Sequence, residues 1–167
     1  MFLADSDQFE KYITFKTMKK NLLKKEAADF IIGRVKSLSA THHPQWGTMT
    51  ASEMLLHCNS CNRQILEESR GNKKTQIKQY LLRILALYLA SNFKKNIQGE
   101  PEHNTKGKTN DADFEKYRNE FIQLINEFPG NTRSLTLSHP AFGNISTQEW
   151  GIAAYKHMDH HLRQFGV

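Results

Sequence analysis

The chain has 167 residues, of which 38% are hydrophobic and 24% are charged. This length and balance indicate one ordinary soluble domain, and they exclude a small scaffold that needs disulfides or a structural metal to fold. The net charge of +6 suggests a nucleic-acid partner, but the lysines lie at expected helix ends and in connecting segments, without interleaved aromatic residues. We therefore expect no nucleic acid among the partners.

We expect no secretory signal at the N-terminus, because Met1–Asp7 turns acidic at once and no apolar segment follows. The most apolar stretch, residues 80–93, is interrupted by Arg83 and is shorter than the ~20 residues that cross a bilayer. We therefore predict a cytoplasmic protein with no membrane partner. The apolar residues of positions 1–17 have no regular spacing, so we expect a tail there and a single domain over residues 18–167.

Apolar residues recur every three or four positions from Met18 to Leu38, as they do on one face of a helix. This first predicted helix ends before Pro44, which disfavours helical geometry in the residue before it. Thr50 and Glu53 then have the spacing of a capping box, in which each side chain bonds a backbone N–H of the other residue. They predict a second helix from about residue 51 to about residue 68.

The second predicted helix carries His57, Cys58 and Cys61 on one side. A Cys-x-x-Cys pair is typical of redox sites and of zinc sites. This pair lies in the middle of a helix, lacks a second pair, and lacks the strand-to-helix turn that activates thiols. We interpret both cysteines as small buried residues, with Cys61 one turn beyond His57 and therefore close to whatever His57 binds.

Two further amphipathic helices are predicted over residues 75–93 and 112–128, and the first is apolar enough that we expect it to be well buried. Residues 94–110 between them are polar and long for a connection in a compact domain, so a mobile loop or lid is expected. His103 within this segment is expected to be exposed. Polar and apolar residues alternate over positions 134–137, a pattern that is consistent with a short strand. One such strand could not form a sheet alone.

The last predicted helix has the clearest ends and the most informative face. Ser146 and Glu149 form another capping box, and Gly166 supplies a left-handed stop. His157 and His161 are four residues apart on the apolar face, a spacing at which two imidazoles can share one metal ion. Two core histidines that each donate to a backbone carbonyl would explain the same spacing, and the helical pattern leaves both interpretations open.

These elements together predict an all-α fold, an up-and-down four-helix bundle with one additional helix. Helix bundles build metal sites from inward side chains of facing helices. His57 is expected to point inward, as His157 and His161 do, so a third ligand is available to a metal held by the last helix.

Several strings of the sequence resemble one known family: Trp46-Gly-x-Met49 before a Met-x-x-His helix, His139-Pro-x-Phe-Gly143, Glu149-Trp150, and Tyr155-Lys-His-x-Asp-His-His-x-Arg-Gln-Phe-Gly166. They are similar to the family catalogued as domain of unknown function 1569, a branch of the DinB-like superfamily of four-helix bundles. The similarity covers residues 18–166.

The resemblance implies a metal site of three histidines, His57, His157 and His161, with Gln164 following three residues later. The implied cofactor is a divalent transition metal, zinc or nickel. Characterised members of the superfamily include thiol transferases and an isomerase that use low-molecular-weight thiols, whereas this branch has no assigned reaction. We therefore expect a small-molecule substrate, for example such a thiol, and related bundles suggest a homodimer.

Three neutral imidazoles leave at least one position of such an ion open, which is the pattern of catalytic rather than structural sites. The expected chemistry is attack of a metal-activated water or thiol on a small electrophile, as in a hydrolase or thiol transferase. Glu53 and His139 are candidate catalytic residues, although the capping box already explains Glu53 and a turn with Pro140 explains His139. The alternative is a non-catalytic metal-binding bundle with a structural or interaction role.

Overall fold

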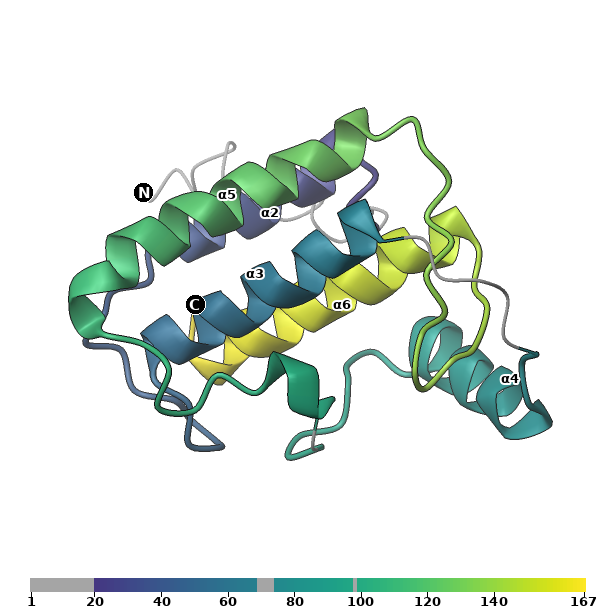
Figure 1. Ribbon diagram of the computed structural model, residues 1–167, viewed down its shortest axis with the longest axis horizontal. Coiled ribbons are helices and arrows are strands. Elements are labelled where there is room, and N and C mark those ends of the chain that lie inside the picture. Colours follow the sequence, from purple (N-terminus) through teal and green to yellow (C-terminus); the bar gives the residue numbers. More distant parts are fainter. Residues whose placement is uncertain (1–19, 69–73, 98) are drawn as a thin grey trace, which may run out of the picture.

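The computed structural model describes residues 20–68, 74–97 and 99–167, and the predicted tail of residues 1–17 lies outside these ranges (Figure 1). The described residues are helical and contain no β-strand, so the predicted all-α class is confirmed for them. The long helices are α2 (Lys25–Lys36), α3 (Ala51–Glu67), α5 (Phe114–Gly130) and α6 (Thr147–Gln164). The short ones are α4 (Ile77–Arg83), the π-helix η1 (Ile84–Leu89), and the 3-10 turns η2 (Pro101–His103) and η3 (Asp111–Asp113).

Both predicted capping boxes are present. Thr50 accepts the N–H of Glu53 at 3.2 Å, and the Glu53 carboxylate accepts the N–H of Thr50 at 2.9 Å. Ser146 and Glu149 make the same reciprocal bonds at the start of α6, at 3.2 and 2.9 Å. Gly166 has a φ of +77°, the left-handed conformation predicted after α6. These caps satisfy backbone groups that a helix leaves unpaired at its ends, and so they fix where α3 and α6 begin.

α2 and α6 run in the same direction. Asn21, just before α2, donates to the carbonyl of Gln148 near the start of α6 at 3.2 Å. Arg34 near the end of α2 pairs with Asp159 in the second half of α6 at 2.6 Å, and it also donates to the carbonyl of Val167. Contacts at both ends therefore set α2 alongside α6.

α3 and α5 form a second parallel pair (Figure 1). Ser52 donates to Asp111 just before α5 at 3.2 Å, and Asn59 donates to the carbonyl of Tyr117 at 2.9 Å. Between the two helices the chain returns through α4, η1 and residues 90–113. This intervening segment supplies the reversal that allows α3 and α5 to run in the same direction.

The core lies among the four long helices. Ile31 on α2, Leu55 on α3, Phe121 on α5 and Leu162 on α6 are all completely buried. Burying one such side chain stabilises the fold by about 1.5–3 kcal/mol. The positions that the helical period assigns to the core in these helices are therefore the ones that pack together.

α4 and η1 depart from the prediction of a well-buried helix over residues 75–93. Most of their large apolar side chains are exposed, including Leu81 at 66% and Leu89 at 71%, whereas Leu87 is buried. Lys156 of α6 donates to the carbonyls of Ala86 and Ala90 at 2.5 and 2.6 Å, which holds the end of η1 against α6. The prediction was wrong because periodicity shows that one face is apolar and does not show what covers it.

The segment before α5 packs against α3. Thr105 donates to the carbonyl of Glu53 at 2.8 Å, and the N–H of Gly107 donates to the Glu53 carboxylate at 2.6 Å. Residues 134–137 form no strand, and one isolated bridge between His139 and Gly143 is the β pairing that the described residues contain. None of the helices in the described ranges has both the length and the apolar character that crossing a membrane requires.

Candidate metal centre

Three histidine rings meet between α3 and α6, which run antiparallel. The Nε2 atom of His157 lies 3.1 Å from Nε2 of His57 and 3.0 Å from Nε2 of His161. Two imidazole nitrogens on one tetrahedral zinc ion lie about 3.3 Å apart, given Zn–N bonds of about 2.0–2.1 Å. The structure thus brings His157 within a few tenths of an ångström of the zinc-site spacing from both other histidines predicted as ligands. His161 lies outside the group of His57, Cys61 and His157, whose ligand atoms are all within 4.8 Å of one another.

His57 is oriented by the backbone of η2. Its Nδ1 lies 2.9 Å from the carbonyl oxygen of His103. Because a carbonyl only accepts, Nδ1 carries the proton of the neutral ring and Nε2 keeps a lone pair. That lone pair is directed toward His157, so His57 presents a metal-binding nitrogen to the cluster.

His161 is oriented by Gln164, one turn further along α6. Gln164 is buried, and its Nε2 donates to the carbonyl of Trp46 at 2.7 Å. This bond turns the amide oxygen of Gln164 toward His161, whose Nδ1 lies 2.9 Å from it and must donate. Nε2 of His161 therefore also carries a lone pair that faces the cluster.

His157 lies between these two lone pairs. Its Nε2 can carry at most one proton, so only one of its two short contacts can be a full N–H···N hydrogen bond. The lone pair of the other ring then has no N–H directed at it, and without that proton the three Nε2 lone pairs converge at contacts of about 3 Å, which is unfavourable. A divalent cation among the three nitrogens would remove this repulsion, because each lone pair would then face a positive charge. Imidazole nitrogens suit zinc and nickel, so the donor set fits the implied cofactor.

The electrostatics of the cluster keep the rings neutral. Burial is the main cause that lowers the pKa of His57, His157 and His161, and for His161 the pKa falls to about 3. Neighbouring histidines add to the effect, since a proton on one ring disfavours a proton on the next. Neutral imidazole is the form that binds metals, so the three rings do not need to lose protons first at neutral pH.

The two cysteines of α3 occupy different environments. Cys61 lies beside the cluster, with its Sγ 3.9 Å from Nε2 of His57. His57, Cys61 and His157 each offer a ligand atom, and all three atoms lie within 4.8 Å of one another. Cys58 is fully buried and its Sγ contacts Sδ of Met54 at 3.6 Å. Burial raises the pKa of Cys61 to about 12 and that of Cys58 well above its usual value, so both thiols stay protonated when no metal is bound.

His103 is not exposed, contrary to the sequence-based prediction. Only 10% of its side chain is accessible, and its ring nitrogens lie 2.8 Å from Ser60 Oγ and 3.0 Å from Gln64 Oε1. These bonds attach η2 to α3 and so position the carbonyl that orients His57. No sequence pattern indicates this role, because His103 lies 46 positions after His57 and stands in a polar segment without helical periodicity.

Glu53 has structural partners for both carboxylate oxygens. One oxygen accepts the N–H of Thr50 and the other accepts the N–H of Gly107. The capping-box explanation for Glu53 is therefore confirmed, and Glu53 also anchors the segment that carries η2. Its catalytic role remains a prediction.

His139 lies in the turn before α6. Its ring stacks on Phe142 with centroids 4.0 Å apart, and its Nδ1 accepts the N–H of Ala141 at 3.1 Å. Burial lowers the pKa of His139 to about 4, so the ring is neutral at neutral pH. These contacts support the turn-forming explanation, and its catalytic role also remains a prediction.

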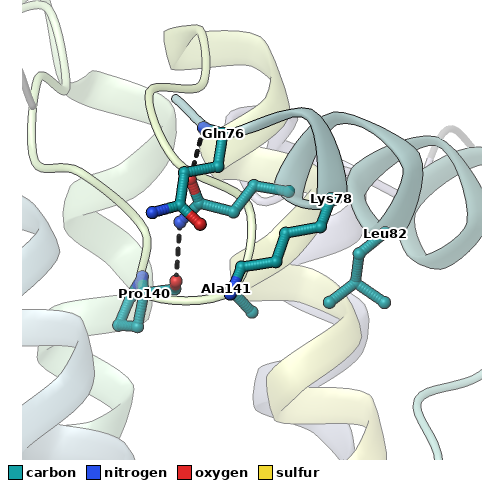
Figure 2. A pocket seen from close by; sticks show the side chains of 6 residues that line it. Gln76, Lys78, Leu82, Pro140 and Ala141 are labelled. Carbon is teal, nitrogen blue, oxygen red and sulfur yellow. Dashed lines mark hydrogen bonds between the residues drawn. The ribbon is translucent and has the colours of Figure 1, made fainter. Parts of the chain in front are cut away.

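A shallow pocket of about 390 Å³ lies at a different place, between α4 and the turn that follows His139 (Figure 2). Gln79 donates to the carbonyl of Pro140 at 3.0 Å, which links α4 to this turn. Its lining consists of Gln76, Lys78, Gln79, Leu82, Pro140 and Ala141. None of these is a histidine, cysteine or carboxylate, so this pocket does not offer the ligand types found at the histidine cluster.

The family to which the chain belongs follows from comparison with known proteins. A family model described as "Protein of unknown function (DUF1569)" matches residues 17–166, which include all the helices of the structure and the three clustered histidines. No curated protein and no solved structure matches the chain. The match covers well over half of the sequence, and the chain therefore belongs to the DUF1569 family.

Proposed function

We propose that this protein is a divalent-metal-dependent enzyme with a DinB-like four-helix bundle, in which His57, His157 and His161 hold zinc or nickel. The observation that carries the proposal is the convergence of three Nε2 atoms with at most one shared proton between them. Two packed core histidines, the alternative from sequence, would each direct a ring N–H at a backbone carbonyl. His161, one of those two, instead directs its Nδ1 N–H at the side-chain oxygen of Gln164, and its Nε2 faces His157.

The bound ion would supply a positive charge that lowers the pKa of a coordinated water or thiol. The protein residues supply the geometry: His103 fixes one imidazole through its carbonyl, and Gln164 fixes another through its amide oxygen. His57 and His157 are partly exposed whereas His161 is buried, so a small electrophile would approach from the side of His57 and His157. The reaction class is attack on that electrophile by water or by a low-molecular-weight thiol.

The metal content of the purified, untagged chain tests this proposal. Plasma mass spectrometry is expected to find about one equivalent of a transition metal in the native chain and none in His161→Ala. His43→Ala is the matched control, because His43 is exposed and lies outside the cluster, and it should retain the metal. The proposal fails if neither the native chain nor the control binds metal after incubation with zinc and with nickel.

A second assay separates an enzyme from a metal-stabilised bundle. The metal-loaded chain would be screened for hydrolysis and for thiol transfer, with turnover compared before and after chelation. Turnover that disappears on chelation and returns with added metal supports the enzyme. A chain that gains thermal stability from the metal and shows no turnover supports the non-catalytic alternative.

A further inference from the structure

Cys61 is the one sulfur ligand within reach of the histidine cluster among the described residues. It follows His57 by four positions on α3, so the two side chains lie one turn apart on the same face. Its Sγ is 3.9 Å from the nitrogen of His57 that faces the cluster, and the ligand atom of His157 lies within 4.8 Å of it. Cys61 is only partly buried, so its sulfur is not sealed inside the apolar core.

We propose that Cys61 is the fourth protein ligand of the metal, and that its thiolate completes a shell formed with His57, His157 and His161. This inference rests on the proposed function, because it requires the histidine site to hold an ion. Metal binding would replace the S–H bond of Cys61 with a sulfur–metal bond, and the proton would be released to solvent.

The distances support this assignment. In a tetrahedral zinc site the sulfur and a ligand nitrogen lie about 3.6 Å apart, given Zn–S of about 2.3 Å and Zn–N of about 2.0–2.1 Å. The separation of 3.9 Å between Cys61 and His57 is a few tenths longer, and the two short histidine contacts are a few tenths shorter than the zinc values. Small side-chain movements would bring the ligand atoms of Cys61, His57 and His157 around one ion. His161 lies outside this group of three, 3.0 Å from His157, and its ring would have to move further toward the ion.

Cys58 provides the internal contrast. It belongs to the same Cys-x-x-Cys pair but lies three residues earlier, on the part of α3 that faces the core. Its Sγ is fully buried against Met54, where an ion would lose its water without gaining other ligands. The two cysteines therefore do not act as a pair, and only Cys61 belongs to the site.

A sulfur ligand changes what the site can do. Four protein ligands close a tetrahedral shell, so a substrate must displace Cys61 or enter as a fifth ligand. A soft thiolate also favours zinc over harder ions. Cys61 would thus control whether the ion is exposed to substrate, and a thiol substrate is the ligand best suited to exchange with it.

Cobalt(II) is the probe that tests this assignment, because a cobalt–thiolate bond has a sulfur-to-metal charge-transfer band in the near ultraviolet. The full-length native chain, Cys61→Ser and Cys58→Ser would each be titrated with cobalt, and helical content would be checked by circular dichroism. We expect the band in the native chain and in Cys58→Ser. Cys61→Ser should still bind cobalt through its histidines, without the band. Its zinc affinity should fall at least about tenfold, the minimum seen for changes to outer-shell partners of metal ligands.

The outcomes separate this inference from the function on which it rests. One equivalent of cobalt bound without the charge-transfer band in the native chain would overturn the role of Cys61 and leave the three-histidine site intact. A band that persists in Cys61→Ser and disappears in Cys58→Ser would show that Cys58, and not Cys61, is the sulfur ligand. No cobalt binding by any variant would defeat the metal site itself.

Discussion

Two regions of the chain have similar apolar patterns in sequence but different surroundings in the structure. The first region is formed by α3 and α6, and the second by α4 and η1. The apolar faces of α3 and α6 are buried against other helices, as Leu55 and Leu162 show. On α4 and η1, Leu81 and Leu89 are largely exposed. Amphipathic periodicity therefore identifies a helix face that is able to pack, whereas the burial of that face depends on whether the fold places other elements against it.

Different interactions hold the two regions in place. α6 is fixed by its cap, by the bond from Asn62 to Met158, and by the ion pair between Arg34 and Asp159. α4 and η1 are attached mainly by polar contacts at their edges. Gln79 donates to the carbonyl of Pro140, and Arg83 donates to the carbonyl of Asn144. Lys156 of α6 donates to the carbonyl of Ala86 in η1 and to that of Ala90 just after it. The stability of the fold should therefore depend far more on the first region than on the second.

The largest expected effect comes from truncating one leucine in each region. Leu162→Ala should lower the free energy of unfolding by about 2–5 kcal/mol, since it leaves a cavity in a closed core. Leu81→Ala should change it by less than about 0.5 kcal/mol, since the side chain already faces solvent. Urea denaturation followed by circular dichroism measures both. Similar losses for the two variants would show that α4 is covered in solution.

Acid stability tests the turn that joins the two regions. His139 contacts Trp150 of α6, and the adjacent Pro140 accepts the bond from Gln79 of α4. Burial lowers the pKa of His139 from 6.5 to about 4. Between these pH values the unfolded chain therefore binds a proton at His139 that the folded chain does not. Stability should fall as the pH drops from about 6.5 to about 4, by up to about 3 kcal/mol for this residue, and this contribution should level off below that range.

The matched variant for this effect is His139→Asn, whose side-chain oxygen can still accept the N–H of Ala141 but does not titrate. Denaturation curves of the metal-free proteins at several pH values should show a smaller acid-induced loss in the variant. The other buried histidines contribute equally to both proteins, so the difference isolates His139. Equal pH dependence in the two proteins would contradict the burial of this ring.

The smallest expected effect concerns one glutamine from each region. Gln164→Leu should weaken zinc binding about 10- to 100-fold, because it removes the group that orients His161. Gln79→Leu on α4 should leave zinc affinity unchanged, because Gln79 bonds only the turn at Pro140 and its own helix start. Competition with a chromophoric chelator measures both affinities. An unchanged affinity in Gln164→Leu would mean that packing alone orients His161.

The predictable parts of the fold are the local ones. The capping boxes at Thr50 and Ser146 predicted where α3 and α6 begin, and both are confirmed. The left-handed Gly166 was predicted for the same reason, since these signals depend on groups a few residues apart. The placement of His157 and His161 on one face of α6 also follows from helical geometry.

The parts that sequence missed all depend on contacts between distant segments. Two such features are the burial of His103 beside His57 and the exposure of Leu81, and both depend on how the described residues between α3 and α5 are placed. Hydrophobic periodicity does not predict the course of a connecting segment, because a connection can return the chain to either end of a bundle with a similar local free energy.

Local sequence was enough to predict the four long helices, the caps of α3 and α6, and the placement of His157 and His161 on one face, because hydrogen bonds and side-chain contacts within one or two turns are set by neighbouring residues. His57 was predicted to join this pair from its inward position and from the family resemblance, with Cys61 one turn beyond it. The contacts that orient the rings, made by Gln164 and the His103 carbonyl, and the exposure of α4 came from the tertiary structure. The physical reason is that the packing of the four long helices fixes which faces meet, and that packing depends on the free energy of the whole chain.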